Sequence, residues 1–234
     1  MTNPTAAPSP SPLRFQGNSV QLVGHYGGDA THALSAWTST IHEMTEERRE
    51  RVGPFLASLA QNGHHTPFEK SVLHFLCTTE IASHIHLLKH RIGVSLNSES
   101  ARYKELRDNK FYVPEDWSVE SQREIQSVLE LCSRSYHRIL AREEGRLGRK
   151  RAKESARFVL PYAMQYTVDV SFNFRSFMHF CGLRVSSHAQ KEIKEVASRM
   201  VEQVALLPGR PFEHSIRAFA ATSLREFPVE RLLG

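Results

Sequence analysis

The order of apolar and polar residues along the chain predicts more helix than strand. Apolar side chains that recur every three or four residues are typical of one face of a helix. Such helical patterns cover residues 29–37, 45–63, 81–91, 118–145, 173–183, 187–208 and 212–225. Short apolar or alternating runs, which are typical of strands, cover residues 19–24, 71–78 and 167–172. The pattern therefore predicts an α+β protein: a helix-rich single domain with a small antiparallel or mixed sheet.

Two helix starts carry a recognisable signal. Ser118 precedes the longest apolar stripe, and serine is a favoured N-cap residue. Ser187 with Gln190 has the spacing of a capping box, so we expect a helix to begin there and to end before Pro208.

The first 14 residues differ from the rest of the sequence. They hold four prolines among small polar residues and lack the basic and apolar regions of a secretory signal. We therefore expect a disordered arm over residues 1–14 and one domain over residues 15–234.

Composition limits the class of protein. Hydrophobic residues make up 40% of the chain and charged residues 24%, as in soluble globular proteins. No apolar stretch approaches the roughly 20 residues that a membrane helix needs, so we expect no membrane partner. The three cysteines Cys77, Cys132 and Cys181 are widely spaced, which argues against disulfides or a zinc site and favours a reducing, cytoplasmic location.

The formal net charge is +5, and the richest basic stretch is 146–157. This modest excess fits an anionic partner such as a nucleotide, a phosphate-bearing cofactor or nucleic acid, without choosing among them.

The densest polar cluster, residues 84–104, is the best candidate for a ligand site. Lys89, His90 and Arg91 fall at the predicted end of a helix, where the helix dipole favours cations. The following residues are rich in Gly, Ser and Asn, and such a loop can cradle a phosphate or a pyrimidine. His84 and His86 also have ligand-like spacing, but they lie on different helix faces, so we expect no metal.

This cluster resembles the signature of flavin-dependent thymidylate synthases. The family form is Arg-His-Arg, seven residues, then Ser. Here Lys89-His90-Arg91 is followed by eight residues and then Ser100-Ala101-Arg102-Tyr103. The first arginine is thus a lysine, and the loop is one residue longer.

Four other segments resemble the same family in the same order, and together the matches cover roughly residues 20–205. They are His64-His65-Thr66-Pro67-Phe68-Glu69, Ala156-Arg157-Phe158-Val159-Leu160-Pro161, Asn173-Phe174-Arg175-Ser176, and Leu183-Arg184 with Ser187-His188-Ala189-Gln190.

The resemblance implies an activity and its reactants. Family members convert dUMP to dTMP with 5,10-methylenetetrahydrofolate as the one-carbon donor, and NADPH reduces the FAD that delivers a hydride. It also implies an α+β fold and a homotetramer with active sites shared between subunits.

The resemblance also assigns residues. Arg184 matches the arginine that promotes the ionised form of the uracil, and we take it as catalytic. The positions matched to dUMP are His86, Ser98, Glu99, Ser100, Ala101, Arg102, Arg157 and Arg184. The positions matched to FAD are Thr66, Glu69, Lys89, His90, Arg91, Asn97, Asn173, Arg175, His179 and His188. Ser39 is also matched to a serine near the flavin.

A second hypothesis is that the protein is a basic nucleic-acid-binding protein that uses the 146–157 stretch. Against it, Phe172, Phe174, Phe177 and Phe180 sit among apolar residues and look buried, which does not suit a platform for stacking bases. We therefore expect small-molecule substrates and no nucleic acid.

Overall fold

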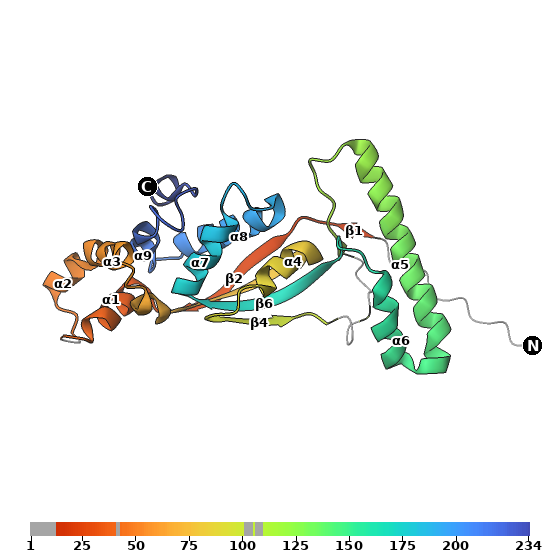
Figure 1. Ribbon diagram of the computed structural model, residues 1–234, viewed down its shortest axis with the longest axis horizontal. Coiled ribbons are helices and arrows are strands. Elements are labelled where there is room, and N and C mark those ends of the chain that lie inside the picture. Colours follow the sequence, from red (N-terminus) through yellow and green to blue (C-terminus); the bar gives the residue numbers. More distant parts are fainter. Residues whose placement is uncertain (1–12, 41–42, 101–104, 106–109) are drawn as a thin grey trace, which may run out of the picture. The chain divides into compact units, whose positions relative to one another are not determined.

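The structure is a computed structural model that describes residues 13–40, 43–100, 105 and 110–234. The elements, in chain order, are β1 (Arg14–Phe15), β2 (Ser19–Tyr26), α1 (Asp29–Trp37), α2 (Glu46–Glu50), α3 (Val52–Gln61), η1 (Thr66–Glu69), β3 (Val72–Glu80), α4 (Ile81–Leu88), β4 (Val94–Ser98), β5 (Lys110–Phe111), α5 (Val119–Leu147), α6 (Arg149–Ala156), η2 (Arg157–Val159), β6 (Gln165–Asn173), α7 (Phe174–Arg184), α8 (Lys191–Ala205), α9 (Glu213–Ala218) and α10 (Val229–Leu233) (Figure 1). The predicted helix-rich α+β class is confirmed.

The residues group into two compact units. The first holds residues 13–18, Thr78–His84 and Ser98–Thr167, and the second holds Ser19–Cys77, Ile85–Asn97 and Val168–Gly234.

The second unit is built on a four-stranded sheet of order β2-β3-β6-β4. Alternation along β3 and β6 turns one set of side chains inward, where Phe75 and Phe172 are fully buried. Helix α8 packs against β2, and α7 packs against α8. The expected burial of Phe172, Phe174, Phe177 and Phe180 is confirmed, and they join one continuous core.

The first unit has its own core. The buried stripe of α5, including Leu129, Tyr136 and Leu140, packs with Ala152 and Ala156 of α6. Strand β1 pairs in parallel with β5. Residues 1–12 of the expected arm lie outside the described residues, whereas Arg14 already belongs to β1.

Several predicted boundaries are wrong. The stretch 45–63 forms two helices that separate at Arg51, because Pro54 has no backbone N–H to donate and so favours a new first turn. The capping box is also wrong: Gln190 is the N-cap of α8, and the backbone N–H of Ser187 donates to Glu226 instead. The last predicted helix is shorter, since α9 ends at Ala218.

The cluster 84–104 differs from prediction in two ways. Helix α4 ends at Leu88, so the basic triplet follows the helix and does not belong to it. The supposed loop contains strand β4, whose Val94 and Leu96 turn toward the core. In the described part of the chain, no helix is long and apolar enough to cross a membrane.

Candidate active site

A hollow of about 470 Å³ lies beside the N-terminus of α7, within the second unit. Four of the residues predicted to bind the cofactor line it: Glu69 from one matched segment and Asn173, Arg175 and His179 from another. The remaining lining residues, which sequence reasoning missed, are His65, Ile92, Gly93, Ser176, Met178, Phe219 and Ser223.

Asn173 and Gly93 form one edge of this hollow. The Asn173 side chain caps α7 by accepting a hydrogen bond from the Ser176 N–H at 2.8 Å, as the favoured N-cap residues do. Its own backbone N–H donates to the Gly93 carbonyl at 2.9 Å. Gly93 has a φ of +64°, and a Cβ there would lie 2.2 Å from Asn173 Nδ2. Only glycine allows the turn to approach the helix this closely.

Glu69 and Arg175 form an ion pair at the rim. Arg175 Nη1 donates to Glu69 Oε1 at 2.5 Å, and both side chains stay partly exposed. A guanidinium held in place by a carboxylate can still offer its other N–H groups to a phosphate or carbonyl.

His90 is buried beside the hollow and has an unused ring nitrogen. It is 8% exposed and packs edge-on to Phe180 and His179, with ring centroids 5.0 and 6.0 Å away. Burial lowers its pKa to about 4, and the charges of Arg184, His179 and His86 add to that shift. The ring is therefore neutral at pH 7. Its Nε2 is buried without a hydrogen-bond partner among the described residues.

Arg184 also has a buried nitrogen without a hydrogen-bond partner among the described residues. It is the last residue of α7, and this nitrogen is its Nε. Burial lowers the pKa of this guanidinium, although arginine remains charged at neutral pH. His86 Nδ1 is a third unpartnered atom, while His86 Nε2 lies 3.4 Å from Gln190 Oε1. Buried polar atoms without a protein partner are uncommon, and a bound ligand or ordered water can supply the missing partner.

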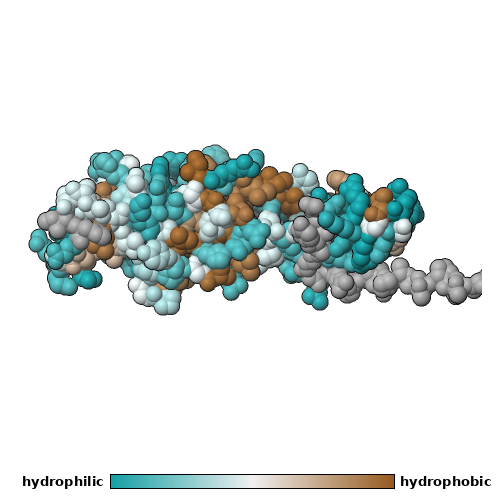
Figure 2. All heavy atoms as spheres, turned by 90° about the horizontal axis from the view of Figure 1, so that it is seen from below, coloured by the Kyte–Doolittle hydropathy of each residue, from teal (hydrophilic) through white to brown (hydrophobic). Residues whose placement is uncertain are grey.

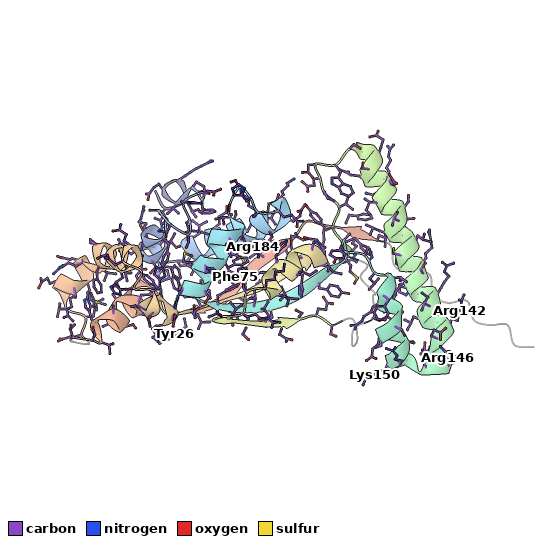
Figure 3. The ribbon with its side chains drawn as sticks, in the orientation of Figure 1. Tyr26, Phe75, Arg142, Arg146, Lys150 and Arg184 are labelled. Carbon is purple, nitrogen blue, oxygen red and sulfur yellow. The ribbon has the colours of Figure 1, made fainter. Side chains whose placement is uncertain are left out.

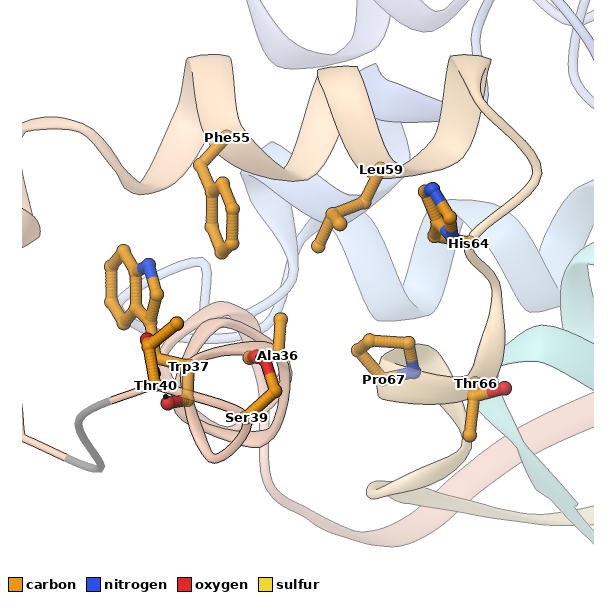
Figure 4. A pocket seen from close by; sticks show the side chains of 9 residues that line it. All are labelled: Ala36, Trp37, Ser39, Thr40, Phe55, Leu59, His64, Thr66 and Pro67. Carbon is orange, nitrogen blue, oxygen red and sulfur yellow. Dashed lines mark hydrogen bonds between the residues drawn. The ribbon is translucent and has the colours of Figure 1, made fainter.

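A second hollow of about 400 Å³ lies between α1 and α3 (Figure 4). Trp37 and Phe55 stack there at 4.8 Å, and the Arg48 guanidinium lies 5.0 Å from the Trp37 ring centroid. Thr66 and Ser39, both matched to the flavin site, line this hollow and not the first. The full lining is Ala36, Trp37, Ser39, Thr40, Phe55, Leu59, His64, Thr66 and Pro67.

The other cofactor candidates in the second unit line neither hollow. Lys89 and Arg91 are exposed in the turn after α4, and Asn97 is exposed on β4. His188 is exposed in the turn between α7 and α8, where its N–H donates to Ser186 Oγ at 3.3 Å.

The first unit holds the remaining substrate candidates. Ser98 Oγ lies 3.0 Å from His84 Nε2, and the backbone N–H of Glu99 donates to the Thr167 carbonyl at 2.8 Å. Burial raises the pKa of Tyr166. The charge of Arg157 opposes this shift, and the charge of Glu99 adds to it.

Glu99 and Arg157 therefore both lie near one phenol, which sequence reasoning missed. Ser100 is half-buried, and Ala101 and Arg102 lie outside the described residues.

No thiol in the core is available for nucleophilic chemistry. Cys77 and Cys181 are fully buried, as expected, and burial raises the pKa of Cys77 to about 12 and also raises that of Cys181. Over the described residues, no group of three or more His, Cys, Asp or Glu side chains could hold a metal ion.

Comparison with known proteins defines the class. The family model described as thymidylate synthase complementing protein matches residues 21–207. The chain belongs to this family, and it is an enzyme. A flavin-dependent thymidylate synthase of Pseudothermotoga lettingae is 31% identical over 85% of this chain and 90% of that protein. One from Streptomyces avermitilis is 32% identical over 81% of this chain and 87% of that protein.

A solved structure is also similar. The UMP/dUMP methylase PolB from Streptomyces cacaoi, bound with 5-Br UMP, has a TM-score of 0.75 and 26% identity, covering 89% of this chain and 96% of that chain. The same enzyme bound with 5-Br dUMP has a TM-score of 0.75 and 27% identity.

Proposed function

We propose that the protein is a flavin-dependent thymidylate synthase that methylates dUMP to dTMP, with 5,10-methylenetetrahydrofolate as carbon donor and NADPH as reductant of FAD. The observation that carries the proposal is the set of unpartnered buried atoms, His90 Nε2 and Arg184 Nε, at positions matched to the flavin and the uracil. Buried polar atoms need a hydrogen-bond partner, and a bound flavin and uracil would supply one at these two positions.

The described residues fit FAD at two places. Asn173, Arg175 and His179 line the first hollow and can hydrogen-bond polar ring atoms, while neutral His90 offers one more nitrogen. Thr66 and Ser39 line the aromatic hollow, which suits a second planar group of an extended dinucleotide. Reduced FAD supplies a hydride when it is bound.

Arg184 provides electrostatic stabilisation. A fixed positive charge beside the uracil stabilises negative charge on the ring, and this charge needs no reorganisation if the side chain is already held. Arg157 and Arg102 are assigned to the dUMP phosphate, because a planar guanidinium can bind a phosphate with two hydrogen bonds.

A homotetramer is part of the proposal, and an uncovered sheet face supports it. Figure 2 shows hydrophobic side chains gathered on one surface of the molecule. On β2 and β3, Val23, Val72 and Leu76 are 44%, 43% and 39% exposed, and His74 pairs with Asp169 across the same face. Such a face is typical of a subunit contact. Sedimentation should give about four times the chain mass, and a monomer that is fully active would contradict this.

The direct test of the proposed reaction is an anaerobic assay with FAD, NADPH and methylenetetrahydrofolate, in which dTMP is measured by chromatography. We expect dTMP from dUMP, and UMP should be assayed beside it because the similar PolB structures carry both analogues. Methylation of UMP alone would change the assigned substrate. No methylated product from either nucleotide would reject the proposal.

A test of the cofactor cradle is Gly93→Ala. The added Cβ would displace the Asn173 side chain, so we expect FAD affinity to fall by about tenfold or more, which corresponds to about 1.4 kcal/mol. FAD binding is measured by the quenching of flavin fluorescence.

The matched control is Gly63→Ala. Gly63 also has a positive φ, at +73°, but nothing lies within 4 Å of a Cβ there. Both variants therefore carry the backbone strain, and only Gly93→Ala carries the clash. Equal FAD affinity in the two variants would show that Asn173 does not hold the flavin.

A further inference from the structure

The excess positive charge of the chain is concentrated in one segment of the first unit, from the middle of α5 through α6 to Arg157. Residues 134–157 contain nine Lys and Arg and three Glu, a net charge of +6, whereas the whole chain carries +5. The rest of the chain therefore has no positive excess.

Within this segment, four arginines form a row that we call the basic ridge: Arg134, Arg138, Arg142 and Arg146. They lie four residues apart on α5, so each step advances about 6 Å along the helix axis and about 40° around it. All four are exposed. Figure 3 labels Arg142 and Arg146 near the end of α5, with Lys150 at the start of α6.

The ridge lies opposite the buried stripe of α5. Arg138 is two residues from both Tyr136 and Leu140, which places it about 200° around the helix from each. The ridge is therefore not needed for packing against α6.

Helix stability does not explain the row. Like charges four residues apart repel each other on a helix. Glu130 lies 3.6 Å from Arg134, and Glu143 lies 2.7 Å from Arg146. Arg138 donates only to the Ser135 hydroxyl at 3.2 Å, and Arg142 has no partner among the described residues.

We propose that the basic ridge binds the phosphate backbone of a nucleic-acid strand without regard to base sequence. Arginine is the residue best suited to phosphate, because its planar guanidinium can donate two parallel hydrogen bonds. A regular row of guanidinium groups matches a ligand that carries a regular row of phosphates.

The surroundings of the ridge favour nucleic acid over a membrane. From Arg134 to Arg149, the exposed positions on α5 and the turn after it hold only Arg, Ala and Gly. The large exposed apolar residues of α5, Val119, Val128 and Leu131, all precede the ridge. A helix that lies in a membrane surface needs an apolar face beside its cations, and this segment has none.

The proposal reverses the sequence-based expectation of no nucleic-acid partner. That expectation depended on the aromatic residues, and they are indeed buried. The ridge needs no stacking, because contacts to phosphate alone give binding that is independent of sequence.

The test is fluorescence anisotropy of the full chain with labelled 20-nucleotide single strands of mixed sequence, one of DNA and one of RNA. Four phosphate contacts predict a salt slope of about −2.8, so affinity should fall about 50-fold between 50 and 200 mM salt. Replacing both Arg138→Gln and Arg142→Gln should weaken binding at 50 mM salt. With two contacts left, the loss between 50 and 200 mM falls to about 7-fold.

The matched control is the pair Arg123→Gln and Arg231→Gln, which removes two exposed arginines outside the ridge and changes the net charge equally. Equal loss of affinity in both double variants would overturn the ridge as a site, as would an unchanged ridge variant. Failure of the wild type to bind either strand at 50 mM salt, or binding only to phosphatidylserine vesicles, would also overturn it. Retained dTMP formation shows that the variants are folded.

Discussion

Replacing Arg184→Ala is expected to lower the rate of dTMP formation at saturating dUMP by about 10²- to 10³-fold. That is the usual loss when one preorganised donor to a developing negative charge is removed. The proposed function gives this role to Arg184, whose side chain is partly buried and whose Nε has no partner among the described residues. Single-turnover rates with FAD-loaded enzyme measure the effect directly.

Two variants control this result. Arg231→Ala removes an exposed arginine from α10 and should leave the rate unchanged. Arg184→Lys keeps the charge but loses the planar fork, so its rate should lie between those of the wild type and Arg184→Ala. A wild-type rate in Arg184→Ala would show that this residue does not stabilise the uracil.

The second large effect concerns stability and depends on a buried polar chain in the second unit. His32 is fully buried, with its two ring nitrogens each 2.8 Å from a serine hydroxyl, those of Ser215 and Ser71. Ser215 in turn donates to Asp29 at 2.5 Å. These hydrogen bonds join α1 to α9 and to Ser71, the residue before β3. They therefore hold α1, the helix that carries Trp37, in place.

Replacing His32→Ala should lower the free energy of unfolding by about 3–5 kcal/mol. The change opens a cavity of aromatic size and removes the ring nitrogens that hydrogen-bond the buried hydroxyls of Ser71 and Ser215. Denaturant titration measures the loss. A loss below about 1 kcal/mol would mean that the network is not closed as described.

The same residue predicts a dependence of stability on pH. Burial lowers the pKa of His32 to about 3, from a model-peptide value of 6.5. Below pH 6.5 the imidazole of His32 binds a proton in the unfolded chain but not in the folded chain. The free energy of unfolding therefore falls as the pH falls from 6.5 toward 3. One such proton changes the free energy of unfolding by about 1.4 kcal/mol per pH unit.

A non-titrating replacement isolates this contribution. His32→Gln can still hydrogen-bond a serine, and its pH slope between pH 6 and 5 should be smaller than that of the wild type by up to about 1.4 kcal/mol per unit. The depressed pKa of His90 acts in the same direction but is present in both proteins. Asp29 acts oppositely at lower pH, since burial raises its pKa. Equal slopes would contradict a neutral, buried His32.

Much of the fold could be predicted because most elements bury a continuous apolar stripe. The stripe of α5 and the alternation of β6 are both long enough to be read locally. Strand β4 was missed because only Val94 and Leu96 alternate within five residues. Helix α6 was missed because its buried face consists of two alanines, Ala152 and Ala156, within a basic run.

The site could be predicted only as a set of matched positions. No local pattern shows that Gly93 lies against Asn173, since they are far apart in the sequence and meet through packing of a turn on a helix. The same limit explains why Thr66 and Glu69, three residues apart, line different hollows. The unpartnered atoms of His90 and Arg184 are also properties of the folded chain alone.

The most direct test of the central claim is the visible absorbance spectrum of the purified protein after incubation with FAD, recorded before and after dUMP is added. The proposed function predicts a bound flavin spectrum that shifts with dUMP, because the cofactor and the substrate share one site. A protein that takes up no FAD and remains colourless would contradict the account.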